Sequence, residues 1–581
     1  MTELINALDE YTNVKFGENG HAEYDWSNSL QERIVQLSFQ IVRNNGNNLE
    51  GTLRNILFTL SNNVKYQMLP EREISLGYLS LLYKMIGHTR DIVDGKGEYE
   101  LTYMMIRVWN EFYPELAKFA LRCLVNLDDD NIHQYGSWKD IKYFCKHCLA
   151  NHMCIDDPLI QHAISITNEQ LRKDYENLHV HQNIGKISLA AKWIPREKSC
   201  QYRNIYESLA TNYFKQYLNG NQTINQMEKA LLKCKTEYRK LLSSLNRAID
   251  TVQIKQCGHN WNNIIFNKVT SVTLTKQKKA FLNIKKDNSV RFPDDEDRVK
   301  CSENFKNHIE QSVSGKVEMK GKRVGMADFT KQAIELNRMN YFDQTEKDLL
   351  NSQWRDNASQ NGGLGKMIAM VDVSGSMEGD PMHVAIALGI RIAEKSMLGK
   401  RVMTFSSKPT WVNLESYTDF ISQVRVVKDA EWGMNTNFYA ALDMILDAIV
   451  TNKMAPEDVQ DMILVILSDM QMDQGDTCDK QKLYESMKEK YADAGIRVNG
   501  VPYKPPHILF WNLRGTSGFP SLSNQPNASM MSGFSPTLLN LFCEQGLDAL
   551  QSVTPWSILN KSLENERYKI MSNYIEHQFS I

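Results

Sequence analysis

Apolar residues recur at helical spacing through residues 29–355. One stripe holds four residues at i, i+4, i+7 and i+11: Leu30, Ile34, Leu37 and Ile41. Similar stripes begin at Leu116 and Tyr238, and polar breaks such as 94–97 separate the stripes. This spacing is typical of amphipathic helices with one buried face. Many helices with short connections predict an α-solenoid-like array, either open or closed into a ring. Because we find no fixed repeat period, the sequence supports no named repeat class.

The pattern changes after residues 356–365, whose Asn, Gly and Ser content predicts a linker. Short apolar runs then alternate with helical stretches. The expected strands are 367–371, 402–405, 462–467 and 508–511, and the expected helices are 380–396, 438–450 and 480–493. Such alternation predicts a mainly parallel, doubly wound, Rossmann-like sheet. The expected parts are an N-terminal segment (1–28), a helical array (29–355), the linker (356–365), an α/β domain (366–560) and a C-terminal tail (561–581).

Composition fits an ordinary multidomain protein. The chain has 581 residues, a net charge of −2, 42% hydrophobic residues and 23% charged residues. This length predicts at least two domains, and these fractions argue against a largely disordered chain. The N-terminus carries acids and no long apolar run follows, so neither a signal peptide nor a membrane span is expected. Ten cysteines are too sparse for a disulfide scaffold. We expect a soluble cytoplasmic protein, with a nuclear or virion location left open.

Oxygen-bearing side chains follow the first strand of the α/β domain. Asp372, Ser374 and Ser376 alternate along one loop and can point at a common cation. Oxygen donors suit Mg²⁺, which usually keeps some water or ligand oxygen in its shell. Two later strand-end loops, 433–437 and 468–469, supply further candidates. The alternative is that these Asp and Ser residues only cap the following helix.

Together these loops resemble the metal-ion-dependent adhesion site of von Willebrand factor A domains. The matching residues are Asp372, Ser374, Ser376, Thr436 and Asp469. The resemblance implies direct ligation by the two serines and Thr436, with the two aspartates acting largely through water. It also implies a divalent cation, with Mg²⁺ expected, that captures an acidic residue exposed on a protein partner.

Further motifs extend the resemblance over residues 30–545. In chain order they are Thr89-Arg90-Asp91, Gly95-Lys96-Gly97, Tyr113-Pro114, Tyr135 to Asp140, Ala191 to Pro195, Asp372 to Met377, Phe510-Trp511-Asn512 and Ser532 to Ser535. This order resembles a family of unknown function found in eukaryotes and large DNA viruses. The layout is similar to TROVE proteins, typified by the Ro autoantigen, which join a helical ring to a von Willebrand A domain. That likeness implies RNA binding on the helical part, without assigning residues to it.

A basic segment gives the RNA hypothesis candidate residues. Residues 229–286 hold thirteen Lys and Arg but only two acids, with Tyr238, Trp261 and Phe281 among them. Bases can neutralise phosphates and aromatic rings can stack on nucleobases. The candidates are Lys229, Lys233, Lys235, Arg239, Lys240, Arg247, Lys276, Lys278, Lys279, Lys285 and Lys286. The alternative is a solvated helical face, balanced by acids such as those at 294–297.

Other chemistry is less well supported. Cys145, Cys148, His152 and Cys154 are compatible with a zinc site, but their helical setting favours buried thiols. We find no phosphate loop, HExxH motif or nucleophile elbow, although metal-assisted phosphoryl hydrolysis stays an open third hypothesis. The sequence therefore predicts a non-catalytic binding or scaffold protein, with an RNA-binding ribonucleoprotein component as the alternative.

Overall fold

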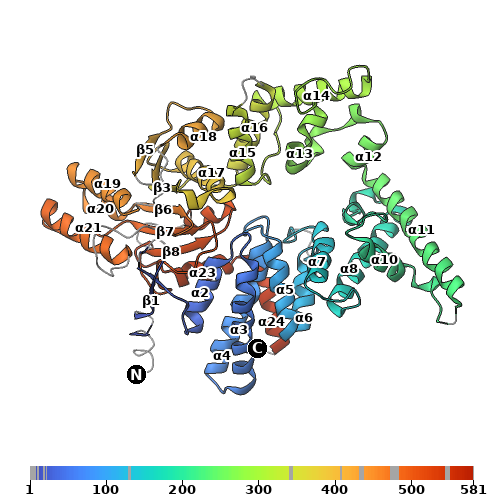
Figure 1. Cartoon of the computed structure of the whole chain (residues 1–581), viewed down its shortest axis with the longest axis horizontal. Coiled ribbons are helices and arrows are strands. Elements are labelled where there is room, and N and C mark those ends of the chain that lie inside the picture. Colours follow the sequence, from blue (N-terminus) through green and yellow to red (C-terminus); the bar gives the residue numbers. More distant parts are fainter. Residues whose placement is uncertain are drawn as a thin grey trace.

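The computed structural model combines a large helical region with one α/β region (Figure 1). The description covers residues 8–9, 12–17, 20, 22–127, 132–220, 222–338, 344–405, 408–430, 438–471, 483–543 and 550–579. In Figure 1 the chain passes from α2 through α11 and α14 to the sheet, and the sheet returns to α2. The first and last parts of the chain therefore lie side by side.

The N-terminal part opens with a small antiparallel pair, β1 (Val14–Phe16) and β2 (Ala22–Tyr24). Seven helices with short connections follow: α2 (Leu30–Gln40), α3 (Gly46–Tyr66), α4 (Glu71–Arg90), α5 (Glu100–Phe112), α6 (Pro114–Cys123), α7 (Lys139–Ala150) and α8 (Pro158–His179). The predicted stripe on α2 is buried, since Ile34, Leu37 and Ile41 are each at most 1% exposed.

The next part continues in helices. It consists of α9 (Ala190–Trp193), α10 (Arg203–Tyr213), α11 (Ile224–Ile249), α12 (Val252–Cys257), α13 (Ser271–Phe281), α14 (Glu296–Val313), α15 (Met326–Arg338) and α16 (Gln344–Ala358). Helix α16 ends inside the segment expected to be a linker. Helix α15 packs against α17 and α18 of the α/β region. Within the described residues, no helix is both long and apolar enough to cross a membrane.

The α/β region is built on a six-stranded sheet of order β5-β4-β3-β6-β7-β8. The strands are β3 (Met367–Asp372), β4 (Arg401–Phe405), β5 (Thr410–Asn413), β6 (Ile463–Ser468), β7 (His507–Asn512) and β8 (Ala528–Ser532). All neighbours are parallel except β5, which pairs antiparallel with β4. The four predicted strands are confirmed. The antiparallel edge β5 and the outer strand β8 went unpredicted, and β5 is a four-residue strand with Trp411 exposed.

Helices cover both faces of this sheet. They are α17 (Asp380–Lys395), α18 (Phe420–Lys428), α19 (Phe438–Thr451), α20 (Pro456–Gln460) and α21 (Leu483–Asn499). Alternate residues of β3 enter different cores: Ile368 and Met370 share one with α19 and α21, and Ala369 and Val371 share the other with α15, α17 and α18. This alternation is what a strand buried on both faces requires. Four predicted strands between two helical layers thus confirm the expected α/β architecture.

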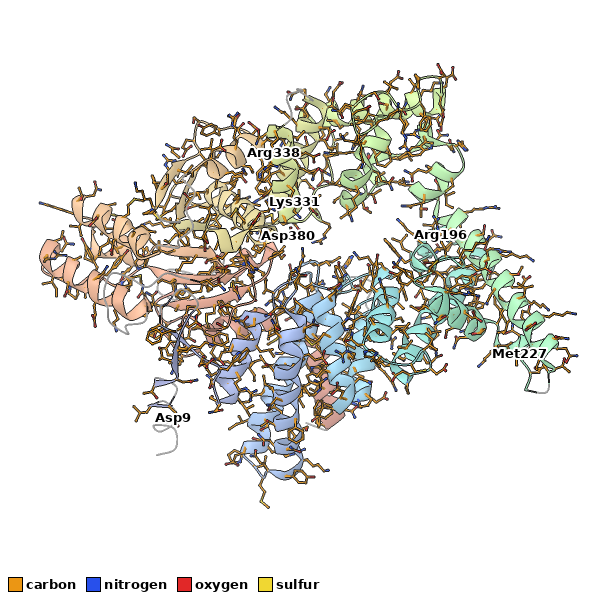
Figure 2. The ribbon with its side chains drawn as sticks, viewed as in Figure 1. Asp9, Arg196, Met227, Lys331, Arg338 and Asp380 are labelled. Atoms are coloured by element: carbon orange, nitrogen blue, oxygen red, sulfur yellow. The ribbon has the colours of Figure 1, made fainter. Side chains whose placement is uncertain are left out.

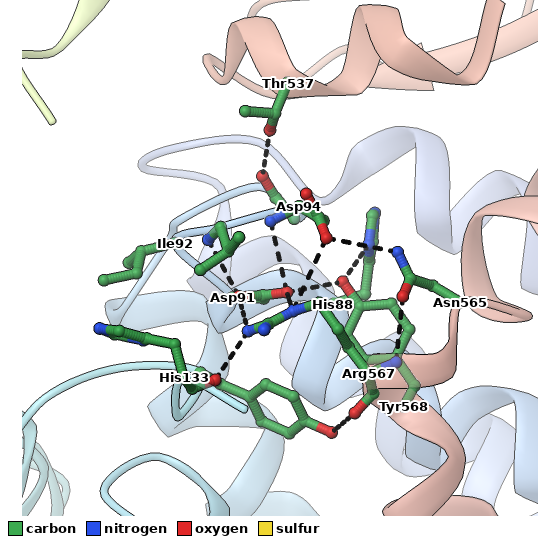
Figure 3. Close-up of polar contacts among 12 residues, drawn as sticks. His88, Asp91, Ile92, Asp94, His133, Thr537, Asn565, Arg567 and Tyr568 are labelled. Atoms are coloured by element: carbon green, nitrogen blue, oxygen red, sulfur yellow. Dashed lines mark hydrogen bonds and ion pairs between the residues drawn. The ribbon is translucent and has the colours of Figure 1, made fainter. Parts of the chain in front are cut away.

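The C-terminal tail returns to the N-terminal helices. It forms α23 (Pro555–Leu563), a short turn (Glu566–Tyr568) and α24 (Lys569–Phe579), and α24 packs on α4. Arg567 donates two hydrogen bonds of 2.6 Å to the Asp91 carboxylate and one of 2.9 Å to the carbonyl of His133. Tyr568 donates to the same carboxylate at 3.1 Å (Figure 3). We call this group, Asp91 with Arg567 and Tyr568, the C-terminal clasp.

A second junction centres on Lys96. Its ammonium donates to the carbonyls of Ser38 and Ile41 at 2.9 and 3.0 Å, and to the Ser532 hydroxyl at 2.6 Å. The two carbonyls lie at the C-terminal end of α2, where a cation is favoured. Ser532 ends β8. One buried lysine therefore joins α2 to the sheet.

Replacing Arg567 with alanine should leave the buried Asp91 carboxylate without its counter-charge. Because Asp91 is fully buried, we expect a loss of about 3 kcal/mol in the free energy of unfolding, measured by urea denaturation. Lys569→Ala is the control, since its pair with Glu566 is solvent-exposed. Equal losses in the two variants would contradict a structural role for the clasp.

Lys96 should make stability depend on pH. Burial lowers the pKa of Lys96 to about 7, although the Glu98 carboxylate raises it; nearby His88, with a pKa of about 3, stays neutral in this range. In the unfolded chain a lysine keeps its proton up to a pH of about 10. The unfolded state therefore binds more protons between these values, and stability should rise with pH in that range. Lys96→Met should abolish this rise in urea titrations at a series of pH values, and parallel pH profiles would refute the assignment.

Candidate functional site at the carboxyl edge of the sheet

Three parallel strands end together at one edge of the sheet. Asp372 ends β3, Ser468 ends β6 and Asn512 ends β7. Val371 pairs with Leu467, and Ser468 pairs with Asn512. The loops that follow these strands therefore converge, as expected for ligand sites in open α/β sheets.

The Asp372 carboxylate is held from two sides. One oxygen accepts a hydrogen bond of 2.9 Å from the backbone N–H of Ser374, and the other accepts one of 2.6 Å from the Ser468 hydroxyl. Asp372 and Ser468 are completely buried. This bracing fixes the orientation of the carboxylate at the start of the loop.

Two hydroxyls and a second carboxylate complete the described part of the site. The hydroxyls of Ser374 and Ser376 lie 3.1 Å apart. One oxygen of Asp469 accepts from the backbone of Gln471 at 3.2 Å, while its other oxygen, Oδ2, is buried without a hydrogen-bond partner. A buried carboxylate oxygen without a donor is costly. A cation would satisfy it.

The electrostatics of the two aspartates point the same way. Burial and the negative charge of Asp469 raise the pKa of Asp372 to about 7, against the hydrogen bonds from the serines. Burial also raises the pKa of Asp469, while the Ser376 hydroxyl and the positive charge of Arg514 lower it. Two neighbouring carboxylates in a buried setting repel each other, so a divalent cation between them would stabilise both.

The helix-capping alternative gains no support from the loop geometry. Ser374 forms no side-chain cap, and the N-cap of α17 is Gly379. Gly379 has a φ of 101°, a conformation that favours glycine, and it turns the loop into the helix. The serine hydroxyls are thus left to face each other.

The structure brings together Asp372, Ser374, Ser376 and Asp469 as the sequence predicted. Thr436 and its loop lie outside the described residues. The described chain contains no group of three or more His, Cys, Asp or Glu that could hold a metal. The fit to a cation therefore depends on the serine hydroxyls as well as on the two carboxylates, which suits a hard ion such as Mg²⁺.

Two supporting residues escaped the sequence analysis. Ser468 was recognised only as the neighbour of Asp469, yet it holds Asp372. Arg514 donates to the backbone carbonyl of Ser376 and so ties the first loop to the end of β7. The one available signal was their position just before or after strand ends, because their partners lie 96 and 138 residues away.

A groove borders the first loop. It has a volume of about 860 Å³ and lies between α15, α17 and α18, with Gly375, Glu378 and Gly379 on its loop side. Its apolar floor is formed by Ile334, Met382 and Ile386, and its polar rim by Lys331, Glu335, Arg338 and Lys428. Figure 2 shows Lys331 and Arg338 along α15, with Lys331 ion-paired to Asp380.

Three cations of this groove act on His383. The pKa of His383 is lowered by burial and by the charges of Lys331, Lys428 and Arg338, while Asp380 raises it. Because these cations are close, a further positive charge on the His383 ring is unfavourable. This field suits an acidic ligand segment.

The predicted RNA-contacting bases do not form one surface. Lys229 to Arg247 lie on α11, Lys276 to Lys279 lie on α13, and Lys285 and Lys286 follow α13; Figure 1 shows α11 and α13 apart. Several are ion-paired: Lys235 with Glu207 at 2.9 Å, Arg239 with Glu197 at 3.1 Å, Lys240 with Glu237 at 2.8 Å, and Lys278 with Glu346.

Two of the three aromatic residues of the basic segment are buried and not available for stacking as predicted, and the third, Trp261, is partly buried. Tyr238 and Phe281 are completely buried. Tyr238 donates to Asn168, and Trp261 lies under the guanidinium of Arg298 at 3.8 Å. These rings are part of the packing, because amphipathic helices place their aromatics on the buried face.

The cysteine cluster consists of buried and exposed thiols on and after α7. Cys145 and Cys148 are fully buried, and burial raises the pKa of Cys145 to about 12. His152 and Cys154 are exposed. The buried-thiol interpretation is confirmed for Cys145 and Cys148, whereas Cys154 is exposed.

Comparisons relate the chain to proteins without an assigned function. Residues 366–574 match the model of a domain of unknown function, DUF7788, and residues 164–360 match that of another, DUF2828. "Uncharacterized protein L728" of Acanthamoeba polyphaga mimivirus is 28% identical over 480 residues, which cover 79% of this chain and 76% of the viral protein. These matches agree with the expected likeness to a family of unknown function that occurs in a large DNA virus. None of them carries the TROVE or von Willebrand A name.

Proposed function

We propose that this chain is a non-catalytic binding protein whose α/β region captures an acidic side chain of a protein partner through a divalent cation. The observation that carries the proposal is the convergence of Asp372, Ser374, Ser376 and Asp469 at one sheet edge, with an unpartnered buried carboxylate oxygen on Asp469. The sheet with helices on both faces and the order of these loops support a von Willebrand A-like domain with a metal-ion-dependent adhesion site.

The donor set explains why such a site would bind rather than react. Hydroxyl ligands bring no charge, so a cation held by Ser374 and Ser376, with Thr436 added from its loop, keeps its attraction for an anionic ligand. A carboxylate from a partner would complete the shell. Among the described residues, no group of three or more His, Cys, Asp or Glu lies at this edge in a position to hold a metal.

The neighbouring groove gives the partner a place to lie. Its apolar floor would bury side chains beside the captured acid, and Lys331, Arg338 and Lys428 would attract further acids. Two acids at the rim, Glu335 and Glu378, would limit how the partner is placed. The partner expected is an acidic segment with apolar residues next to the ligating Asp or Glu.

Magnesium should stabilise the folded protein. Since a ligand that binds only the folded state shifts the unfolding equilibrium, saturating Mg²⁺ should raise Tm by about 3 °C or more, and EDTA should reverse the rise. Asp372→Ala should remove the shift, whereas Ser535→Ala, a hydroxyl loss in the loop after β8, should keep it. Tm is measured by differential scanning calorimetry. An equal rise in Tm with Mg²⁺ in wild type and in Asp372→Ala would disprove the site.

Capture of an acidic residue can be tested on peptide arrays. Each peptide should be printed with Glu or Asp, and again with Gln or Asn at the same position. We expect wild-type protein to bind a subset of the acidic peptides in Mg²⁺ only, and to lose them on amide substitution, in EDTA and in Asp372→Ala. Binding that ignores all three changes would rule out metal-mediated capture.

A further inference from the structure

Helix α7 carries a partly exposed face that consists of three lysines and one tyrosine. Lys139, Lys142, Tyr143 and Lys146 fall at i, i+3, i+4 and i+7, which is one side of a helix. Tyr143 is 37% exposed, and Tyr99, at the start of α5, is 43% exposed. We call these five residues, with Lys192 and Trp193 of α9, the α7 face.

The lysines of the α7 face have no acidic partners. None of Lys139, Lys142, Lys146 and Lys192 forms an ion pair with any described residue. Asp140, which follows Lys139 in the chain, is buried and accepts hydrogen bonds of 2.8 Å from two guanidinium nitrogens of Arg90. Lys146 donates only to the amide oxygen of Gln201, at 3.2 Å.

Lys139 and Lys142 are partly buried, and the charge of Lys139 acts on Lys142. The pKa of Lys139 is lowered by burial and by the charges of Arg90 and Lys276, with Asp140 opposing. The pKa of Lys142 is lowered by burial and by the charge of Lys139. Lys139 also begins α7, where the helix dipole disfavours a cation. Folding holds these charges together at a cost that a bound polyanion would offset.

Aromatic rings lie between these charges. The ammonium of Lys142 is 5.0 Å from the Trp193 ring and 5.2 Å from the Tyr143 ring, and that of Lys192 is 5.6 Å from Trp193. The rings of Tyr99 and Tyr143 are nearly parallel, with centroids 6.3 Å apart. Exposed rings beside unpaired lysines are the combination that binds single-stranded nucleic acid, since bases stack on the rings while lysines meet phosphates.

The α7 face continues into a cavity between distant parts of the chain. Lys139 and Tyr99 line this space of about 300 Å³ together with Val272 of α13 and Arg323. In Figure 1, α13 lies above α7. Lys276, one of the bases singled out from the sequence, acts on Lys139 across this gap.

We infer that the α7 face, bounded by Tyr99 and Lys192, binds single-stranded nucleic acid. The ligand class is a polyanion with stackable bases, which an acidic protein segment does not provide. The α7 face shares no residue with the cation site at the sheet edge, so either proposal can be disproved without affecting the other.

The test is fluorescence anisotropy of the full-length protein with labelled oligouridine RNA and oligothymidine DNA of about 12 nucleotides, in EDTA. With four lysines on phosphates, log K should fall against log salt with a slope of about −3 between about 50 and 200 mM. Lys142→Gln with Lys146→Gln should flatten the slope by about 1.4 and weaken binding. Tyr143→Ala should weaken binding about tenfold without changing the slope, and Tyr143→Phe should restore it.

The matched control is Lys229→Gln with Arg247→Gln, two exposed bases on α11 that form no ion pair with any residue that the structure describes. It removes the same charge from the basic segment and should leave binding unchanged. Binding of RNA alone or of both nucleic acids supports the inference. The inference is overturned if no binding occurs at about 50 mM salt, or if the control variant loses as much affinity as the α7 variant. It is also overturned if polyglutamate displaces the RNA and Tyr143→Ala leaves the affinity unchanged. Thermal melts of every variant confirm that each one is folded.

Discussion

The Lys96 ammonium group is the point on which the arrangement of this chain depends. It satisfies two carbonyls at the end of α2 and the Ser532 hydroxyl at the end of β8, from a position completely enclosed by protein. A buried ammonium is tolerated only when its donors are used. The helical region and the sheet must therefore meet at this place, and the clasp around Asp91, reached from the same loop, fixes the C-terminal tail beside it.

This junction also borders the candidate cation site. The Asn512 side chain donates to the carbonyl of Phe39 in α2 at 3.1 Å and accepts from the backbone of Arg514 at 3.0 Å. Arg514 in turn holds the carbonyl of Ser376. The first loop of the site is thus braced by a strand end that is itself anchored on the N-terminal helices. A loop placed by such a chain of contacts is preorganised, which lowers the cost of binding a ligand.

Local pattern predicted the parts of this structure that depend on local sequence. The strands 367–371 and 462–467 are continuous apolar runs, and Asp372, Ser374 and Asp469 follow or end them, so both the sheet and these candidate oxygen donors could be found in advance. Strand β5 is short and partly exposed and left no such signal. Ser468 and Arg514 could not be assigned roles, because their partners come from strands that meet only in the folded sheet.

The distribution of charge along the sequence also failed to predict which basic residues folding leaves unpaired. The segment 229–286 has the largest excess of bases, yet folding places acids such as Glu197 and Glu207 from α9–α10 against α11 and buries its aromatic residues. The number of lysines in the α7 sequence is ordinary. The adjacent acid, Asp140, however, is ion-paired with Arg90, a residue 50 positions away in the chain. A surface attracts polyanions through the charges that folding leaves unpaired, and their number is set by tertiary contacts rather than by composition.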